Sequence, residues 1–156
     1  MWTIADAASV MTLASCSRHG PWAADVYFAR SEDGLYFYSS PQSRHCQDFA
    51  ADSRTAATIH VASEHWRDIR GLQIVGKVVP VIERSAKAAA MAVYLAKFPL
   101  VRDFFQSPKS MGKAIADKMG RVAPYVLWAE TIYVTDNTSG FGNRQEYHVA
   151  QLDSHS

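Results

Sequence analysis

The sequence predicts a mostly β, α+β fold in which six antiparallel strands form a small barrel, with helices inserted after the third and fifth strands. Three observations favour this class. Short runs rich in β-branched and aromatic residues alternate with turns that contain glycine, proline or aspartate. Two runs, 69–82 and 124–135, are long enough to be bent barrel strands. The alanine-rich stretch 85–98 has the composition of a helix.

The N-terminal part is expected to open with a helix and to continue as a meander. Thr3 and Asp6 have the spacing of a capping box, so this helix should run to about Val10. Turns that contain glycine, at 17–20 and 31–34, separate the runs that follow. The expected first three strands are 11–15, 22–29 and 35–39.

A short helix and two more strands should follow the meander. Pro41 ends the third strand, and Ser43 can cap a helix that runs to Ala51. Residues 55–61 have the pattern of a fourth strand, and 69–82 that of a bent fifth. Three residues within the fifth strand indicate bulges or a sheet edge: Gly71, Gly76 and Pro80.

The C-terminal part is expected to hold two helices and the last strand. The helix over 85–98 ends at Pro99. Proline near its start and Gly120 after its end predict a second helix over 108–119. A largely buried sixth strand, 124–135, is followed by a loop rich in Asp, Asn, Ser and Gly.

Composition indicates one compact domain over 1–150 with a polar tail at 151–156. The chain has 156 residues, of which 48% are hydrophobic and 20% charged, and a formal net charge of +1. No basic run or long apolar run predicts a nucleic-acid or membrane partner, so we expect a cytoplasmic protein. Cys16 and Cys46 have apolar neighbours and are expected to be buried free thiols. No histidine or cysteine spacing predicts a metal site.

The most informative stretch runs from Gly34 to His45, where a β-rich run breaks and delivers polar side chains to a helix start. An anion at that point would meet free backbone N–H groups and the positive end of the helix dipole. Arg44 could hold phosphate oxygens in bidentate fashion. On the residues alone, an alternative stays open: an ordinary turn and N-cap, with solvated side chains.

This stretch resembles the phosphate motif of the pyridoxamine 5′-phosphate oxidase-like superfamily, the FMN-binding split barrels. The resemblance implies a split β-barrel and phosphate contacts at matching positions. His45 stands where the oxidases usually have lysine, and beside a phosphate the pKa of its imidazole should rise. The candidates implied in this loop are Ser39, Ser40, Ser43, Arg44 and His45.

Two further segments, 69–76 and 135–144, resemble a small bacterial branch of the same superfamily. The family lays the backbone of its second strand along the flavin ring and builds the site across a homodimer. This implies contacts from the second strand and from a far wall supplied by the second subunit. For the loop at 135–144, an Asx turn without cofactor contact stays open as the alternative. The implied residues are Ala24, Val26 and Tyr27 in the strand, and Gln73, Trp66, Asn137, Phe141 and Arg144 elsewhere.

The resemblance implies an FMN-dependent oxidoreductase that passes hydride through flavin N5 to a small-molecule acceptor. Because Gly71 stands where the biosynthetic oxidase has glutamine, vitamin B6 oxidation is not expected. No protein nucleophile or acid stands out, so the flavin would supply the chemistry. Three alternatives stay open: FAD or deazaflavin in place of FMN, a non-catalytic protein that stores, carries or senses flavin, haem or another tetrapyrrole, and a scaffold without a ligand.

Overall fold

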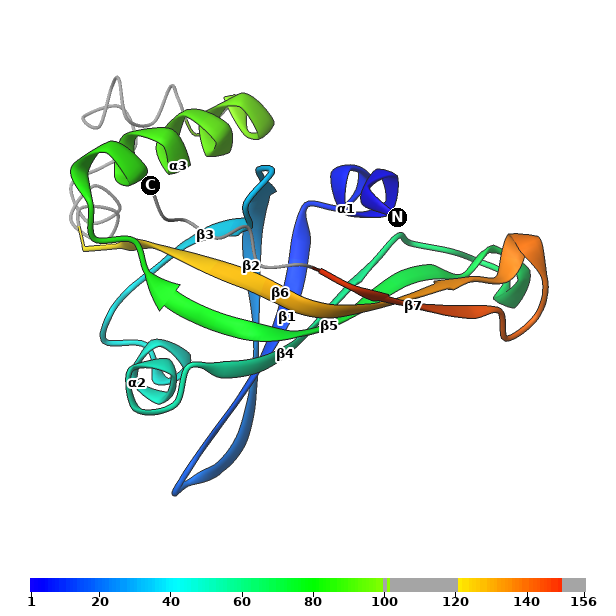
Figure 1. Ribbon diagram of the computed structural model, residues 1–156, viewed down its shortest axis with the longest axis horizontal. Helices are drawn as coiled ribbons and strands as arrows, with labels where there is room; N and C mark the ends of the chain where they lie inside the picture. Colours follow the sequence, from blue (N-terminus) through cyan, green and yellow to red (C-terminus); the bar gives the residue numbers. More distant parts are fainter. Residues whose placement is uncertain (100, 102–120, 150–156) are drawn as a thin grey trace.

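The computed structural model describes residues 1–99, 101 and 121–149 (Figure 1). The predicted helix over 108–119 and the tail lie outside these residues. In chain order the elements are α1 (Trp2–Ala7), β1 (Val10–Ser17), β2 (Gly20–Arg30), β3 (Leu35–Ser39), α2 (Arg44–Ala51), β4 (Arg54–His60), η1 (Trp66–Asp68), β5 (Arg70–Pro80), α3 (Arg84–Lys97), β6 (Ala123–Asp136), η3 (Asn137–Ser139) and β7 (Arg144–His148).

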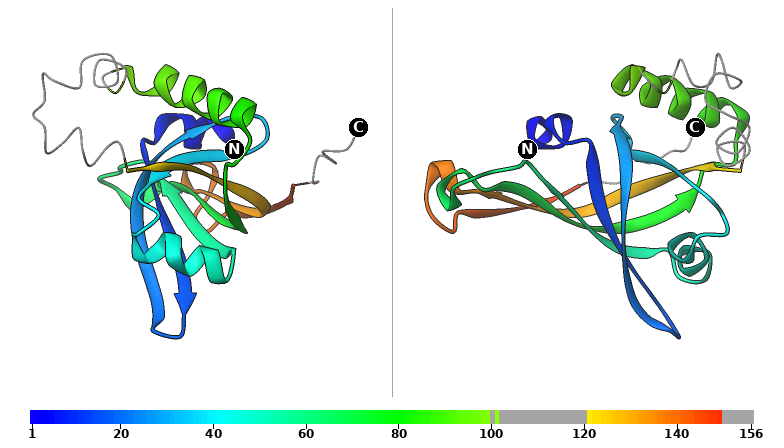
Figure 2. Two further views of the ribbon diagram at one scale, coloured as in Figure 1. Left: turned by 90° about the vertical axis from the view of Figure 1, so that its left-hand side faces the viewer. Right: turned by 180° about the vertical axis from the view of Figure 1, so that it is seen from behind.

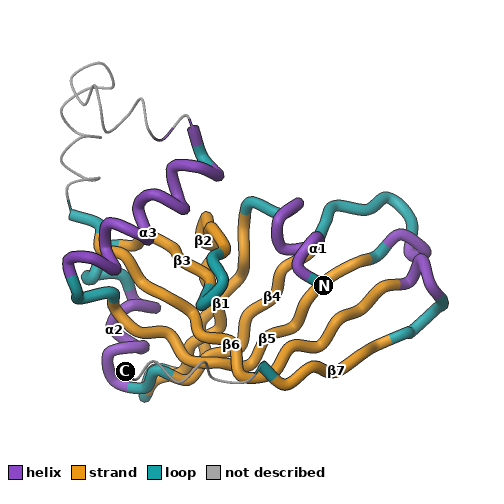
Figure 3. The backbone as a smooth tube through the Cα atoms, turned by 45° about the horizontal axis from the view of Figure 1, so that its top comes forward, coloured by secondary structure: helices purple, strands orange, loops and turns teal. Residues whose placement is uncertain are grey.

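The seven strands form one antiparallel sheet in the order β3-β2-β1-β4-β5-β6-β7. Because β3 also pairs with β6, six strands close into a ring, and the prediction of a six-stranded antiparallel barrel is confirmed. The seventh strand, β7, was not predicted. It pairs with the second half of β6 and runs beside it at the edge of the sheet (Figure 3). All five residues of β7 are exposed, so the strand has no apolar face that a sequence pattern could indicate.

Buried and exposed side chains alternate along the strands, and the buried ones form the core inside the ring. In β4, for example, Thr55, Ala57 and Ile59 are buried while the residues between them are exposed. The largest fully buried side chains are contributed by strands on every side of the ring: Met11, Leu13, Phe28, Leu35, Phe37, Ile59, Leu72, Ile74, Val78, Leu127 and Ile132.

Helices cover the ring at different places (Figures 1 and 2). The predicted helix 85–98 is confirmed as α3, and Ala90 on it packs with Tyr36 and Val126 on the outside of the barrel. None of the helices described is long and apolar enough to cross a membrane.

The first helix differs in detail from the prediction. Its N-cap is Met1, two residues before the predicted cap Thr3, and no side chain caps it, so Thr3 lies inside the helix and the predicted capping box is wrong. It ends at Ala7 because Val10 already pairs with Tyr27 in the sheet.

The long strands β5 and β6 meet at a bulge between Val75 and Gly76. A Cβ atom at Gly76 would overlap the carbonyl oxygen of Trp128 on β6. The predicted bulge in this strand is therefore confirmed at Gly76, where the close approach of two backbones excludes any side chain.

Gly76→Ala is expected to lower the free energy of unfolding by about 2 kcal/mol or more, because β5 and β6 would have to separate. Urea denaturation of both proteins measures the difference. Val75→Ala is the matched control, since this neighbouring side chain points outward and is 46% exposed. Equal stability of Gly76→Ala and the wild type would contradict the close approach.

Candidate functional site

The turn between β3 and α2 shapes the predicted phosphate site. Ser43 occupies the N-cap position of α2 in extended backbone conformation, as predicted. Its side chain does not cap the helix, however, because Oγ donates a hydrogen bond to the Ser40 carbonyl oxygen at 2.7 Å. Ser40 Oγ accepts from the Gln42 backbone N–H at 3.2 Å, so the Ser40 hydroxyl stabilises the turn in which it lies.

Three of the predicted phosphate residues meet at this helix start. His45 Nε2 lies 2.7 Å from Ser39 Oγ and 3.2 Å from Ser43 Oγ. Because the Ser43 proton is donated to Ser40, Ser43 can only accept from the imidazole. A proton on Nε2 satisfies this arrangement and leaves the Ser39 hydroxyl free to donate. We call Ser39, Ser43 and His45 the hydroxyl–imidazole cluster.

The imidazole of this cluster is held in its neutral form. His45 is half-buried, and its burial lowers its pKa below the ordinary value, while the carboxylate of Asp48 opposes that shift. Phe49 lies edge-on to the imidazole ring at a centroid distance of 6.4 Å. At neutral pH the cluster therefore presents uncharged donors.

Arg44 lies on a different face of α2 from the cluster. Its Nη2 donates to the carbonyl oxygens of His19 and Gly20, each at 3.2 Å, and its guanidinium lies 4.5 Å from the centroid of the Trp22 ring. Its Nε is buried without a hydrogen-bond partner. These contacts join α2 to the β1–β2 hairpin.

A buried carboxylate completes this junction and was not predicted. Asp48 accepts a hydrogen bond from Ser15 Oγ on β1 at 2.8 Å, and Arg44 Nε lies 3.9 Å from the same carboxylate. The Ser15 hydrogen bond holds the pKa of Asp48 below its usual value, with a smaller contribution from Arg44. The i, i+4 spacing of Arg44 and Asp48 was the available signal.

One edge of β2 is open beside the cluster. Pairing with β3 involves only 28–30, whereas 20–27 pair with β1 on the other side. Phe28 N–H donates to the Ser9 carbonyl, so the even-numbered residues direct their main-chain groups toward β1. Ala24 and Val26 therefore have their main-chain groups committed to β1. Tyr27 lies where the pairing with β3 begins. The main-chain groups at the open edge are those of Ala23 and Asp25, and neither residue was among the predicted site residues.

A second group of predicted residues lies where the loops η1 and η3 meet. Asn137 Nδ2 donates to the Trp66 carbonyl oxygen at 2.7 Å, and its backbone N–H donates to Ile69. Phe141 packs edge-on against the Trp66 ring at a centroid distance of 5.1 Å and is 81% exposed. The predicted Asx interaction is also present, since Asp136 accepts from the Thr138 N–H. We call Trp66 and Phe141 the aromatic tip.

Gln73 and Arg144 flank one aromatic ring on the outer face of the sheet. Gln73 is opposite Tyr133 in the β5–β6 register, and the Arg144 guanidinium lies 4.3 Å from the centroid of the Tyr133 ring. Tyr133, Arg144 and Glu146 line an open hollow of about 360 Å³. Tyr133 was not among the predicted residues.

The two groups of predicted residues do not meet within one chain. Figure 1 and the right-hand view of Figure 2 place α2 at one end of the molecule, and η1 and η3 at the other. The hydroxyl–imidazole cluster and the aromatic tip therefore lie at opposite ends.

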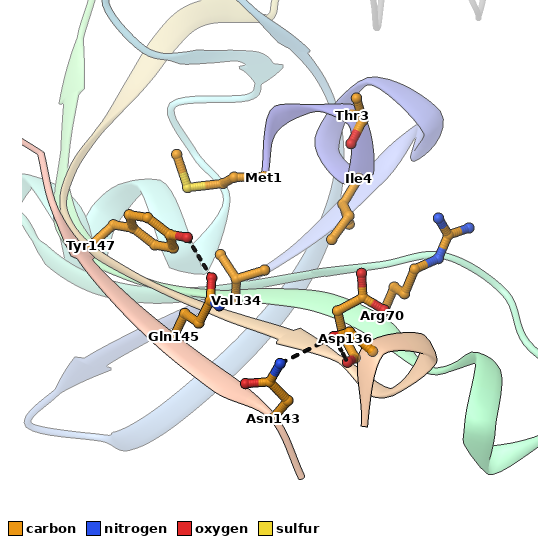
Figure 4. Close-up of a pocket in the computed structure, with 10 residues that line it drawn as sticks. Met1, Thr3, Ile4, Arg70, Val134, Asp136, Asn143, Gln145 and Tyr147 are labelled. Carbon is orange, nitrogen blue, oxygen red and sulfur yellow. Dashed lines mark hydrogen bonds between the residues drawn. The ribbon is translucent and has the colours of Figure 1, made fainter. Parts of the chain in front are cut away.

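A further pocket, of about 180 Å³, lies between the start of α1 and the strands β6 and β7 (Figure 4). Its polar wall includes Asp136, Asn143, Gln145 and Tyr147, and Tyr147 donates to Gln145 at 2.5 Å. It contains none of the predicted site residues, and its volume is below the roughly 300–1,000 Å³ of typical cofactor pockets.

The two cysteines differ in their exposure. Cys46 is a buried free thiol as expected, but Cys16 is exposed because it occupies an outward position on β1. Within 1–99, 101 and 121–149, no group of three or more His, Cys, Asp or Glu side chains could hold a metal ion.

The donors at the start of α2 fit a phosphate group. The Ser39 hydroxyl is free to donate, the Ser43 hydroxyl and the imidazole N–H could donate to a phosphate oxygen in exchange for their present partners, and the helix dipole supplies a favourable field. None of the three side chains of the cluster is a carboxylate, and the Asp48 carboxylate, whose charge acts on His45, accepts a hydrogen bond from Ser15.

Comparisons with known proteins give a relative by sequence and several solved structures of similar fold. The UPF0306 protein plu4501 of Photorhabdus laumondii is 26% identical over 137 residues, covering 86% of this chain and 84% of that protein. A heme binding protein from Mycobacterium smegmatis superposes with a TM-score of 0.72 at 19% identity over 94% of this chain, which spans 55% of that protein's length. An FAD-binding protein from Mesorhizobium loti gives a TM-score of 0.66 at 13% identity, over 94% and 90% of the two chains.

The family whose model matches residues 3–123 is described as pyridoxamine 5′-phosphate oxidase. This match covers more than three quarters of the chain and includes the strands, the turn and the helix that build the cluster. The chain belongs to the pyridoxamine 5′-phosphate oxidase family.

Proposed function

We propose that this protein binds FMN at the start of α2 and acts as a flavin-dependent oxidoreductase on a small molecule. The observation that carries the proposal is the convergence of Ser39, Ser43 and His45 beside a helix N-terminus, in a chain of this family. These donors suit a phosphate monoester, which riboflavin lacks. FMN, when bound, would supply hydride transfer at N5.

The open edge of β2 supports a place for the flavin ring. The main-chain groups of Ala23 and Asp25 face away from β1. They lie next to the end of β3, which carries Ser39. Main-chain N–H and C=O groups in a row can pair with the polar edge of a planar heterocycle. The proposal therefore assigns ring recognition to Ala23 and Asp25 together with Tyr27, and phosphate recognition to the cluster.

A homodimer would complete the site. The cluster and the aromatic tip lie at opposite ends of one chain, so a two-fold arrangement is needed to bring a tip to a cluster. Where β1 pairs with β4, the outer face carries short side chains that would let a second sheet approach closely. Outward residues on this face include Ala14, Ala56, Thr58, Gln73 and Val75.

Haem binding is the second candidate, because one structural neighbour is named a heme binding protein and another a heme storage protein from Vibrio cholerae. On this chain, His60 is exposed at the end of β4, and His65 begins the exposed η1 loop. A haem protein would show a Soret band that depends on one of these histidines.

The deciding experiment is to titrate the purified protein separately with FMN, riboflavin and hemin, and to follow absorbance and flavin fluorescence. We expect FMN to bind more tightly than riboflavin, and bound FMN to bleach when a reduced nicotinamide is added without oxygen. Binding of hemin alone would replace the proposal with the haem function. Flavin binding without any bleaching would contradict the proposed reductase activity and favour a protein that carries flavin.

Ser43→Ala is expected to weaken FMN binding about tenfold or more, because a hydrogen bond to a charged group contributes roughly 1.5–3 kcal/mol. Riboflavin binding should not change, since riboflavin has no phosphate. Fluorescence titration measures both affinities. Gln42→Ala, an exposed residue in the same turn, is the control. An unchanged ratio of FMN to riboflavin affinity in Ser43→Ala would contradict a phosphate site here.

Phe141→Ala is expected to weaken FMN and riboflavin equally, by about threefold to tenfold, because an aromatic contact contributes roughly 0.5–1.5 kcal/mol. The folded protein should keep its stability, since the ring is 81% exposed. Ile82→Ala, 73% exposed elsewhere, is the control and should change neither affinity. If Phe141→Ala binds both flavins like the wild type, the aromatic tip is not part of the site.

A further inference from the structure

The strand β7 has hydrogen-bonding side chains on the face where a barrel strand normally carries apolar ones. In its register with β6, Gln145 is opposite Val134 and Tyr147 is opposite Ile132, and both of these β6 side chains are buried. Residues directly opposite each other in a sheet direct their side chains to the same face. Gln145 and Tyr147 therefore extend the inner face of the barrel, on the side that α1 covers (Figure 4).

These polar side chains and the start of α1 enclose the pocket of about 180 Å³. This space equals about six water molecules at roughly 30 Å³ each, so a ligand that fits it is much smaller than a flavin or a haem. Ile4 on α1 and Val134 on β6 are buried and give the pocket an apolar wall. A matching ligand has polar groups toward β7 and a short apolar part toward α1.

Two acceptor oxygens at the η3 end of the pocket have no donor among the described residues. Asp136 Oδ1 accepts from Thr138, which leaves Oδ2 without a partner. Asn143 Nδ2 donates to Ser139 Oγ at 3.1 Å, which leaves Oδ1 without a partner. The side-chain hydrogen bond from Thr138 holds the pKa of Asp136 below its usual value, so this carboxylate is charged at neutral pH. Because Asp136 and Asn143 are joined through their main chains, the pair can receive a cationic donor such as an ammonium group.

A donor group lies two residues further along the chain. Tyr147 donates to Gln145 Oε1, so Nε2 is the group of this amide that has no partner within the described part of the chain. In a strand, residues two apart are separated by roughly 7 Å, which is the spacing of Asn143 and Gln145. An ammonium group and a carboxylate on the same carbon atom, with a hydrogen bond at each end, span about this distance.

The charge of Arg70 fits the same pattern. Arg70 is opposite Asp136 in the β5–β6 register but contributes less to the lowered pKa of Asp136 than the Thr138 hydrogen bond does. Figure 4 shows the Arg70 guanidinium at the edge of the pocket, turned away from the Asp136 carboxylate. The pocket therefore has a negative group and a positive group that are not bonded to each other, and a ligand with both charges complements them.

We propose that this pocket binds a small zwitterion, an α-amino acid with a short apolar side chain, whose ammonium group bonds to Asp136 and Asn143 and whose carboxylate bonds to Gln145. The charge of Arg70 attracts the same carboxylate, and the apolar side chain lies against Ile4. The pocket shares no residue with the proposed flavin site, so this inference is independent of the proposed function.

Three probes with the same branched carbon skeleton separate the two charges. L-Valine carries both, isobutylamine lacks the carboxylate, and 3-methylbutanoate lacks the ammonium group. ¹H–¹⁵N correlation NMR of the whole chain detects binding through the side-chain amide signals of Asn143 and Gln145. We expect L-valine to shift both signals, and the other two probes to bind about tenfold or more weakly, because each loses hydrogen bonds that involve a charged group.

Two variants and a control test the assigned contacts. Asp136→Asn should weaken L-valine binding about tenfold or more, since asparagine can still accept from Thr138 but has no charge. Gln145→Glu should have a similar effect, because it replaces the donor by a second carboxylate. Glu146→Gln is the control and should bind like the wild type, because Glu146 is opposite Tyr133 and lines the hollow on the outer face. Far-UV circular dichroism checks that each variant is folded.

Four results would overturn the inference. Isobutylamine that binds as tightly as L-valine would make the pocket a cation site, and 3-methylbutanoate that does so would make it an anion site. Amide signals that do not move up to the solubility limit of L-valine would leave a pocket for water alone. Unchanged affinity for L-valine in both Asp136→Asn and Gln145→Glu would place the amino acid elsewhere on the protein.

Discussion

The buried carboxylate of Asp48 is the interaction on which the candidate site depends. It ties α2 to β1 through Ser15 and holds Arg44 beside the hairpin. With that face of α2 fixed, the rotation of the helix about its own axis is fixed too, and His45 is directed toward the end of β3. A helix free to rotate would not keep an imidazole 2.7 Å from Ser39.

Helix geometry explains why adjacent residues of one motif have different roles. Successive residues on an α-helix point about 100° apart, whereas residues four apart share a face. Arg44 and Asp48 share the face that meets the hairpin, and His45 and Phe49 share the face that meets the cluster. A sequence motif places both side chains at one helix start, but it does not specify which neighbours each of them will contact.

Local patterns could predict most of the fold. The strand 35–39 and the alanine-rich helix follow from composition and turn residues, and the structure gives them the expected bounds to within a residue. The strand β7 could not be predicted, because its residues are held by pairing with β6 alone. The hydrogen bond from Ser15 to Asp48 could not be predicted either, since the two residues are separated by 33 positions in the chain. The free edge of β2 depends on where β3 stops pairing, which is a property of the sheet rather than of local sequence.

The separation of the cluster from the aromatic tip determines what kind of site one chain can make. The cluster has polar donors but no large exposed aromatic ring beyond Trp22, which Arg44 already covers. The aromatic tip has two exposed rings that pack edge-on, with Asn137 bonded to the Trp66 carbonyl oxygen, far from those donors. A phosphorylated planar ligand needs both kinds of surface, and a closed barrel cannot bend its ends together. In the proposed homodimer a second copy of the chain would supply the missing surface without any change in fold, and the assembly and the ligand would then depend on each other.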